Sequence, residues 1–487
     1  MNTVLITHSY YYKFDRKQWR FKQPYPPLGT LLAAAVVREL GFPVTLFDSN
    51  LAEGPEQFGE KIRRHPARYV IIYDDGFNYL TKMCLTNMRE AAFEMAKVAK
   101  KHGCTVIVCS SDASDHYEKY FPHGVDFVVR GEGEETLKEL LPVLEKRGDL
   151  SQVNGLAYKN LGKTVLNEPR KVLKDLDGLP FPAWDLLDIA PYRRIWKKYH
   201  GYFSLNIATT RGCPFKCNWC AKPIYGNRYN SRSPENVVRE IEMLLEKFQP
   251  DHFWICDDIF GLKPGWVEQF RDLVSAKKLR FRYKIQSRAD LLLEEKIIDA
   301  LTESGAEMVW IGAESGSQKI LDAMDKGITV EQIRHASGLL RQKNVQTGFF
   351  LQFGYLGENL QDIEATIRMV LELMPDDLGI SVSYPLPGTK FYEKVKSQLN
   401  EKKNWTDSDD LSLMFENTFN KEYYRQLHRF VHSLYRKKKG YNILKKIGKN
   451  PFALNSRDLK SGLSAFYYLP VTISRQIRLK KLATAQK

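Results

Sequence analysis

Three cysteines lie close together in the middle of the chain, in the run Arg211-Gly-Cys213-Pro-Phe-Lys-Cys217-Asn-Trp-Cys220. Their spacing is C-x3-C-x2-C. A cubane iron–sulfur cluster normally takes four thiolates, so three of them leave one iron open to a small molecule, as chemistry at a metal requires. The pattern therefore predicts a [4Fe-4S] cluster with Cys213, Cys217 and Cys220 as its metal ligands and catalytic centre.

A zinc site is the alternative interpretation of the same residues. Zinc sites usually show paired C-x2-C units and a complete set of four ligands. The fourth ligand would have to be His200, His252 or Cys256, none of which stands at a typical zinc spacing. Seven cysteines in 487 residues, three of them clustered, fit a reducing cytoplasm and not a disulfide framework. The cluster is the favoured reading, and a zinc-binding scaffold stays open.

With Trp219 just before the last cysteine, the motif resembles that of the radical S-adenosylmethionine (radical SAM) superfamily. The resemblance implies that the open iron binds the amino and carboxylate groups of SAM. It also implies an electron donor such as flavodoxin or ferredoxin. The electron breaks a carbon–sulfur bond of SAM and gives a 5′-deoxyadenosyl radical, which takes hydrogen from an unactivated carbon.

Strands and helices alternate over residues 201–395, and they must position the cysteines. The strand candidates are residues 204–209, 252–256, 282–286, 308–312, 346–353 and 379–383. The helix candidates are residues 235–248, 267–276, 295–304, 330–343 and 360–373. Six such units fit the partial (β/α)6 barrel of the superfamily, with active residues expected at the carboxyl ends of the strands.

Polar residues follow the second and third of these strands. Asp257 and Asp258 stand where the resemblance implies hydrogen bonds from the SAM amino group, and a carboxylate suits an ammonium. Capping of the next helix would explain both aspartates equally well. Arg288 would clamp the SAM carboxylate with its planar guanidinium; an ordinary surface ion pair is the alternative.

The fourth and fifth strands end in segments that also resemble the family. Glu314 and Ser315 belong to a Glu-Ser-Gly segment that lies beside the ribose and methionine of SAM in related enzymes. Gln352 stands in a looser match, where the family has a glycine near the adenine. The resemblance thus implies that all three residues contact SAM.

Residues 1–150 also alternate short apolar runs with helical patterns. The strand candidates are residues 3–8, 43–48, 69–75, 105–110 and 126–129. Helical stretches such as 29–40 and 83–102 lie between them, which predicts a doubly wound, flavodoxin-like parallel sheet with helices on both faces. Ligands of such sheets bind beyond the carboxyl ends of the strands.

Three loops at that edge resemble the cobalamin-binding-like domain found ahead of many radical SAM enzymes. The resemblance implies cobalamin contacts from Pro27, Gly29, Ser110, Gly131, Glu132 and Gly133. The D-x-H-x-x-G motif, whose histidine ligates cobalt in several cobalamin proteins, is absent; the first loop offers only His8. Cobalt would then lack that ligand. The alternative is a domain that binds nothing, because a fold alone does not fix function.

Residues 151–200 are predicted to be a linker with a β-hairpin, and residues 396–487 a basic helical region. Residues 421–487 hold 17 Lys and Arg against two acids, which accounts for the whole net charge of +15. A basic amphipathic helix can lie on an anionic membrane face; a capping helix on the barrel is the alternative. We expect neither a signal peptide nor a membrane span, and no nucleic-acid partner.

Together these motifs resemble those of a radical SAM enzyme, which implies that a [4Fe-4S] cluster cleaves SAM to a 5′-deoxyadenosyl radical. The resemblance implies a cobalamin-dependent methyltransferase acting on an unactivated carbon of a small or lipid-like substrate. Radical cyclisation or oxidation without methyl transfer, as in the anaerobic magnesium-protoporphyrin monomethyl ester cyclase, fits the same residues. A radical SAM enzyme whose N-terminal domain only docks substrate or partner is a further alternative.

Overall fold

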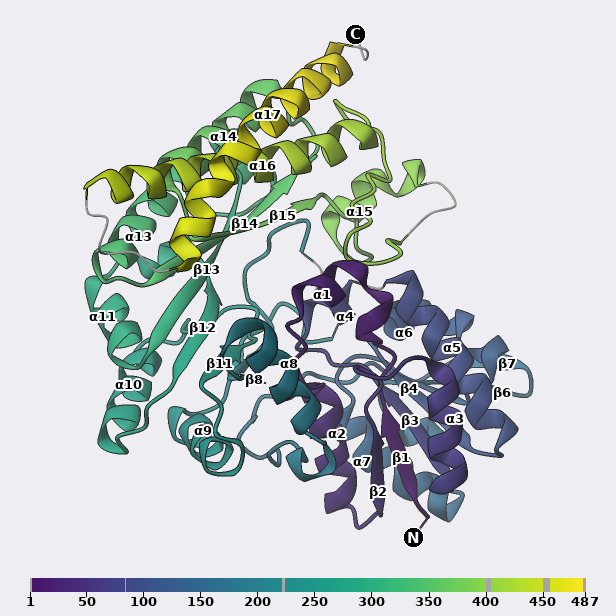
Figure 1. Ribbon diagram of the computed structural model, residues 1–487. Helices are drawn as coiled ribbons and strands as arrows, with labels where there is room; N and C mark the ends of the chain where they lie inside the picture. Colours follow the sequence, from purple (N-terminus) through teal and green to yellow (C-terminus); the bar gives the residue numbers. More distant parts are fainter. Residues whose placement is uncertain (1, 84, 221–223, 400–403, 450–455, 485–487) are drawn as a thin grey trace.

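The computed structural model describes residues 2–83, 85–220, 224–399, 404–449 and 456–484 (Figure 1). Two α/β units lie beside each other. The N-terminal unit runs from purple to blue in Figure 1, and the second, in teal and green, carries two long C-terminal helices. This arrangement confirms the predicted fold class: a doubly wound parallel sheet, a partial barrel and a helical C-terminal region.

The N-terminal sheet has seven strands in the order β2-β1-β3-β4-β5-β6-β7. Its parallel strands are β1 (Val4–Thr7), β2 (Val44–Phe47), β3 (Tyr69–Tyr73), β4 (Thr105–Cys109) and β5 (Phe127–Val129). Every residue of β1 and β3 is buried, as parallel strands covered on both faces require. Helices α2 (Leu28–Glu39) and α7 (Glu134–Lys146) cover one face; α3 (Pro55–Arg64) and α5 (Thr86–Lys101) cover the other.

The predicted hairpin forms, and it belongs to this sheet. Strands β6 (Leu156–Asn160) and β7 (Lys163–Leu166) pair antiparallel, and β6 also pairs antiparallel with β5. The sheet thus continues past residue 150, where the sequence predicted the linker to begin. The rest of that segment contains α8 (Ala190–His200), which begins with Pro191 in its first turn, a position that tolerates proline.

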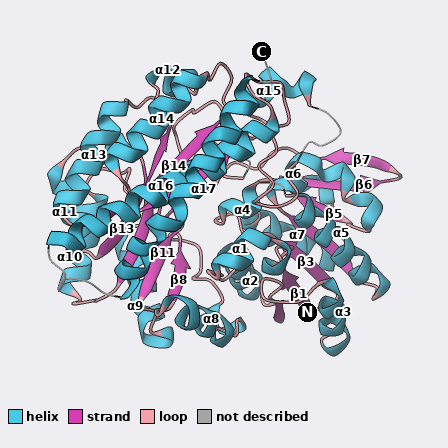
Figure 2. Cartoon of the chain, turned by 45° about the horizontal axis from the view of Figure 1, so that its top comes forward, coloured by secondary structure: helices cyan, strands magenta, loops and turns pink. Residues whose placement is uncertain are grey.

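The second sheet has six strands in the order β15-β14-β13-β12-β11-β8, and all neighbouring pairs are parallel. The strands are β8 (Ser204–Ile207), β11 (His252–Ile255), β12 (Arg282–Ser287), β13 (Ala306–Glu314), β14 (Gln346–Phe353) and β15 (Asp377–Val382). The helices that connect them are α9 (Pro234–Phe248), α10 (Trp266–Ala276), α11 (Glu295–Glu303), α12 (Gln318–Ala323), α13 (Val330–Gln342) and α14 (Leu360–Leu373). They follow one another along the outside of the curved sheet (Figure 2).

Side chains of the barrel strands alternate between two environments. On β12 and β13 one set, including Ile285 and Ile311, is fully buried, whereas the other set, including Lys284 and Trp310, is only partly buried. Since successive residues of a strand point to opposite faces, the first set packs under the outer helices. The second set lies on the inner face of the sheet, where it stays partly exposed.

The C-terminal region closes the β15 side of the barrel. Short α15 (Lys390–Val395) precedes two long helices, α16 (Lys421–Lys449) and α17 (Ser456–Thr484), which pack on each other. Helix α16 buries its apolar side, including Tyr423 and Leu427, and Tyr435 donates a hydrogen bond to the carbonyl of Pro375 (2.5 Å). Helix α16 therefore caps the barrel, which was the alternative to a membrane-bound helix for this region. Among the described residues no helix is long and apolar enough to cross a bilayer.

Candidate active site

The cysteine loop leaves the end of β8 through a two-stranded clamp. Strand β9 (Thr210–Arg211) pairs antiparallel with β10 (Asn230–Ser231), and the three cysteines lie in the loop between them. Gly212 begins this loop with φ of 76°, and a Cβ there would collide with the carbonyl oxygen of Arg228. Only glycine suits a left-handed, crowded position, so Gly212 fixes the direction in which the loop starts.

Asp257 holds the root of this clamp. From the end of β11 its carboxylate accepts hydrogen bonds from the backbone N–H groups of Thr209 (2.7 Å) and Thr210 (3.0 Å), and from the Thr209 hydroxyl. Burial raises the pKa of Asp257 to about 6, although these hydrogen bonds oppose the rise. The SAM contact predicted for Asp257 stays a prediction; in this structure its oxygens serve the cysteine loop.

Asn218 anchors the middle of the loop, a role that the sequence reasoning missed. Its side chain donates to the carbonyl of Ala323 (2.7 Å) and accepts from the Tyr355 hydroxyl (2.6 Å), while its backbone N–H donates to the carbonyl of Met324 (3.0 Å). The neighbouring Trp219 packs against the apolar cluster that includes Met324. An asparagine between two cysteines was the only available signal, because its partners lie more than 100 residues away in the chain.

The thiols of Cys213, Cys217 and Cys220 are half-buried and are not joined in disulfides. Two lysines act on them. Burial opposes the charge of Lys326, but Glu314 and the Cys217 thiol outweigh it, so the pKa of Lys326 is raised. Lys82 is likewise held charged, by Asp258 and the Cys220 thiol, and its pKa is raised despite burial. Two lysine ammonium groups therefore lie close enough to the cysteine loop to interact with the thiols of Cys217 and Cys220.

Asp258 takes part in an ion pair that joins the two units. Its carboxylate forms an ion pair with Lys82 of the N-terminal unit, with 2.6 Å between Oδ1 and Nζ. This contact ties helix α4 (Tyr79–Lys82) to the end of β11. Within the described ranges, no group of three or more His, Cys, Asp or Glu side chains is arranged to hold a single metal ion.

Arg288 joins three segments at the end of β12. Its guanidinium carbon lies 3.6 Å from the ring centroid of Phe215 in the cysteine loop, a close cation–π stack. The same group donates to both carboxylate oxygens of Asp290 (2.9 and 3.1 Å) and to the carbonyl oxygens of Lys326 (2.9 Å) and Gly327 (3.2 Å). Arg288 thus lies against the cysteine loop, and the SAM carboxylate contact predicted for it stays a prediction.

Glu314 has an unusual backbone at the end of β13. Its φ is 55°, and the register between β13 and β14 shifts between Gly312 and Glu314. A left-handed conformation is costly for a residue with a side chain and is typically kept at functional sites. The bulge aims the buried carboxylate at Lys326, with 2.8 Å between Oε1 and Nζ. Since Lys326 also acts on Cys217, Glu314 belongs to the surroundings of the cysteines.

Ser315 and Gln352 lie farther along the same edge of the sheet. The Ser315 hydroxyl lies 3.1 Å from the hydroxyl of Thr366 on α14, and the Gln352 side-chain amide donates to the Ser383 hydroxyl (2.9 Å). Both are buried. All the residues predicted to contact SAM therefore stand at the carboxyl ends of their strands, and which of them touch SAM stays a prediction.

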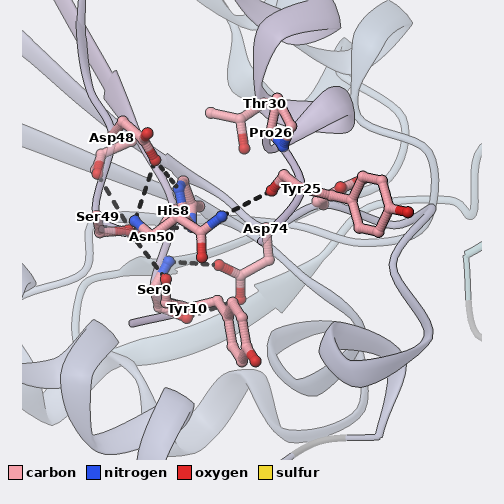
Figure 3. Close-up of polar contacts among 12 residues, drawn as sticks. His8, Ser9, Tyr10, Tyr25, Pro26, Thr30, Asp48, Ser49, Asn50 and Asp74 are labelled. Atoms are coloured by element: carbon pink, nitrogen blue, oxygen red, sulfur yellow. Dashed lines mark hydrogen bonds and ion pairs between the residues drawn. The ribbon is translucent and has the colours of Figure 1, made fainter. Parts of the chain in front are cut away.

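Polar side chains also gather at the carboxyl ends of β1, β2 and β3 in the N-terminal unit (Figure 3). His8 is buried, and its two ring nitrogens lie 3.1 Å from Asp48 Oδ1 and 3.0 Å from the Ser49 hydroxyl. Ser9 donates to Asp74 through both its backbone N–H (2.7 Å) and its hydroxyl (2.9 Å). In this arrangement neither nitrogen of His8 is free to ligate a metal.

The loop with Pro27 and Gly29 is held by a carboxylate that lies just after β3. Asp75 accepts hydrogen bonds from the backbone N–H groups of Leu28 (3.2 Å) and Gly29 (3.0 Å), the first residues of α2. A negative charge at a helix N-terminus is stabilising. A Cβ on Gly29 would lie 3.0 Å from Asp75 Oδ1, so this glycine allows the close approach. Ser110 similarly caps α6 (Ser111–His116), accepting from the N–H of Ala113 (2.9 Å).

The Gly-Glu-Gly-Glu turn after β5 reaches the cysteine loop. The guanidinium of Arg211, two residues before Cys213, pairs with Glu132 (2.9 Å) and Glu134 (2.7 Å), and all three side chains are almost fully buried. We call these three residues the interdomain triad. Burial raises the pKa of Glu132, whereas Arg211 outweighs burial at Glu134 and lowers its pKa.

The glycines of this turn have different surroundings. A Cβ on Gly133 would lie within 2.8 Å of Cys109 Sγ and would also collide with Tyr73, so packing inside the domain requires glycine there. Gly131 has φ of 79° and open space around it, with the carbonyl oxygen of Ile224 the nearest atom at 3.9 Å. The cobalamin contacts predicted for Gly131, Glu132 and Gly133 stay predictions, and Glu132 is committed to Arg211 in this structure.

Comparison with known proteins relates this geometry to a family. Residues 207–370 match the model of the Radical SAM superfamily. An uncharacterized methyltransferase of Pyrococcus horikoshii is 29% identical over 394 residues, 78% of this chain and 81% of that protein. The anaerobic magnesium-protoporphyrin IX monomethyl ester cyclase of Rubrivivax gelatinosus is 28% identical over 281 residues, 56% of this chain and 49% of the cyclase. The hopanoid C-3 methylase of Methylococcus capsulatus is 28% identical over 388 residues, 77% of this chain and 69% of the methylase.

Two solved structures share the fold at 18% sequence identity. The cobalamin-dependent S-adenosylmethionine radical enzyme OxsB, with aqua-cobalamin and S-adenosylmethionine bound, superposes with a TM-score of 0.73 over 98% of this chain and 72% of that one. The radical S-adenosylmethionine methyltransferase TsrM from Kitasatospora setae, with cobalamin and a [4Fe-4S] cluster bound, gives a TM-score of 0.66 over 81% and 75% of the two chains.

Proposed function

We propose that this chain is a cobalamin-dependent radical SAM methyltransferase acting on an unactivated carbon, and the match of residues 207–370 to the Radical SAM superfamily model supports this. The observation that carries the proposal is the cysteine loop. It leaves the carboxyl end of the first barrel strand and is fixed at its root by Asp257 and in its middle by Asn218. The curated methyltransferase relatives and the cobalamin-bound structures of the same fold support it.

The residues at the cysteine loop fit a [4Fe-4S] cluster. Three half-buried thiols on one loop, with Lys82 and Lys326 acting on two of them, offer the thiolate donors that such a cluster uses. When bound, the cluster and SAM supply the radical that abstracts hydrogen, with an electron from a donor of the flavodoxin or ferredoxin type. The chain's own contribution is to orient the bound groups and to exclude water. Asp257 and Asn218 fix the cysteine loop, and Arg288 stacks on Phe215 of that loop.

The seam between the two units offers groups that suit cobalamin. Asn50 donates to the carbonyl of Tyr25 (2.7 Å), and Asn206 of the barrel donates to the carbonyl of Pro26 (3.0 Å). The amide oxygens of both side chains are buried and have no hydrogen-bond partner among the described residues. Buried acceptors normally have donors, and primary amides, which surround the corrin ring, are suitable donors. Cobalamin would supply the methyl group there.

Anaerobic reconstitution tests the proposal directly. We expect about four iron and four sulfide per chain, with cobalt bound in near-stoichiometric amount, and formation of 5′-deoxyadenosine from SAM after reduction. Zinc alone, without iron, would contradict the proposal and support the scaffold. Iron without cobalt would contradict the cobalamin part and leave the radical SAM part standing.

Radical cyclisation without methyl transfer is the second candidate, favoured by the similarity to the Rubrivivax gelatinosus cyclase. The two outcomes differ in the fate of the SAM methyl group. With SAM labelled in the methyl carbon, a methyltransferase places the label in the product, whereas a cyclase leaves the product unlabelled.

We further propose that helix α17 brings the enzyme to an anionic membrane that holds a lipid-like substrate. Helix α17 exposes an apolar stripe in which each side chain is at least half exposed. The stripe consists of Leu463, Phe466, Tyr467, Ile473 and Ile477. These positions repeat at helical spacing, and the surrounding chain carries the whole excess of positive charge. Apolar side chains flanked by cations suit an interface with anionic lipid.

The double variant Phe466→Asp, Ile473→Asp tests this membrane contact. We expect the wild-type chain to float with vesicles that contain anionic lipid and the variant to stay in the soluble fraction, because two charges replace the apolar contact. Leu161→Asp, at an almost fully exposed leucine in the β6–β7 turn, is the control outside α17 and should float like the wild type. Equal flotation of the wild type and the double variant would refute the proposal.

A further inference from the structure

The inner face of the barrel sheet carries an aromatic plate made by Trp310 and Phe350. The two rings are stacked, with centroids 4.6 Å apart and 23° between their planes. A Cβ on Gly348 would collide with the indole of Trp310, and a Cβ on Gly379 would lie 3.0 Å from the Phe350 ring. The rings therefore lie across the neighbouring strands, over two positions that have no side chain.

This plate is not covered by the fold. Trp310 and Phe350 are only partly buried, unlike the residues that alternate with them, Ile311, Phe349 and Leu351, which are at most 1% exposed. Large aromatic side chains that lie flat and partly exposed in a concave sheet provide contact area for an apolar ligand. The register places Gln286 directly beside Trp310 and Lys284 one pleat nearer the start of β12.

Lys284 is a cation without a carboxylate partner on this face. Its Nζ lies 5.2 Å from the ring centroid of Tyr25 and 5.5 Å from that of Trp254. No ion pair or hydrogen bond of its ammonium is found within the described residues; Asp377, at the start of β15, acts on it only at longer range. Burial lowers the pKa of Lys284, and interactions with Tyr202 and Asp377 oppose this only in part.

The side chains of His252 and Tyr25 do not neutralise the charge of Lys284. His252 is occupied by the Ser204 hydroxyl (2.9 Å), and Tyr25 is bonded to the same hydroxyl (3.1 Å). Two further cations that face this end of the sheet, Arg436 and Lys439 of α16, act on Asp377 and compete with Lys284 for its charge. A ligand with its own negative charge is the complement that this face lacks.

We propose that the inner face of the barrel binds a largely apolar substrate that carries one oxyanionic group, with the body on the Trp310–Phe350 plate and the oxyanion at Lys284. This inference rests on the proposed function and names the substrate class of the same site. Lys284 lies on β12 and Arg288, which contacts the cysteine loop, is the first residue after β12; four residues of extended chain separate them by roughly 13 Å at about 3.3 Å per residue. The oxyanion is therefore held well away from the carbon that reacts.

Two probes that differ by one charge test this inference. Anilinonaphthalene sulfonate carries a sulfonate, and N-phenylnaphthylamine has the same rings without it. Equilibrium dialysis with the full-length, cluster-loaded protein measures the affinity for each. We expect Lys284→Met to weaken binding of the sulfonate at least about tenfold, as loss of one charge-assisted contact implies, and to leave the neutral probe unchanged. Lys284→Arg should retain sulfonate binding.

Two further variants test the aromatic plate and the specificity of the lysine effect. Gly348→Ala should displace Trp310 and weaken both probes. Lys296→Met, at an exposed lysine that pairs with Glu294, should change neither. Wild-type sulfonate binding by Lys284→Met, or an equal loss with both probes, would overturn the inference. Formation of 5′-deoxyadenosine by the wild-type protein and by Lys296→Met reports on the proposed function separately from probe binding.

Discussion

Replacing Cys217 with alanine is expected to reduce the iron content from about four per chain to near zero and to abolish 5′-deoxyadenosine formation. Two thiolates cannot hold a cubane cluster with an open iron, and the loop offers no substitute ligand at that place. The loss should be seen in the iron analysis, in the visible absorption of the cluster and in the SAM cleavage assay alike. The same result is expected for Cys213 and Cys220.

Cys256→Ala is the matched control for this prediction. Cys256 lies next to Asp257, is buried, and donates from its thiol to the carbonyl of Ile207 (3.2 Å). If the cysteine trio alone binds the cluster, this variant keeps its iron and its SAM cleavage. Loss of bound metal in Cys256→Ala, with zinc in the wild type, would instead indicate that Cys256 completes a zinc site.

The second large effect is expected from the interdomain triad. Arg211→Met leaves Glu132 and Glu134 buried without their cation, and breaking a buried ion pair in this way costs about 3–5 kcal/mol. In calorimetry we expect the unfolding transition of the N-terminal unit to fall by roughly 10 °C. SAM cleavage should fall as well, because Arg211 is the last residue of β9 and helps to set where the cysteine loop begins.

The triple variant Arg211→Met, Glu132→Gln, Glu134→Gln separates charge from packing. Removing all three charges is often nearly neutral for stability, so much of the lost transition temperature should return. Arg38→Met, which breaks an exposed pair with Asp185, should change it little. If Arg211→Met unfolds at the wild-type temperature, the triad does not hold the two units together.

Features with a local physical cause could be predicted from the sequence. Alternating short apolar runs predicted the parallel strands of both sheets to within two residues at either end, whereas helix α5 begins three residues later than expected. The cysteine motif, the polar strand ends that follow it and a hairpin within residues 151–200 could be predicted for the same reason. In each case the residues that cause the structure are neighbours in the chain.

The partners of those residues could not be predicted, because they depend on contacts across the fold. Glu132 was expected at a cofactor and pairs with Arg211, 79 residues later. Asp257 was expected at SAM and accepts hydrogen bonds from the root of the cysteine loop. A carboxylate in a strand-end loop satisfies several roles equally well, and only its nearest donor in space selects one.

Spacing and periodicity along the chain were enough to predict the order of the two α/β units and the position of the cysteine loop. The folded chain was needed to show that β6 and β7 extend the first sheet, that α16 closes the barrel while α17 keeps an apolar stripe exposed, and that Trp310 lies over Gly348. These outcomes depend on which surfaces are buried against each other, and burial is a property of the folded chain, not of any segment alone.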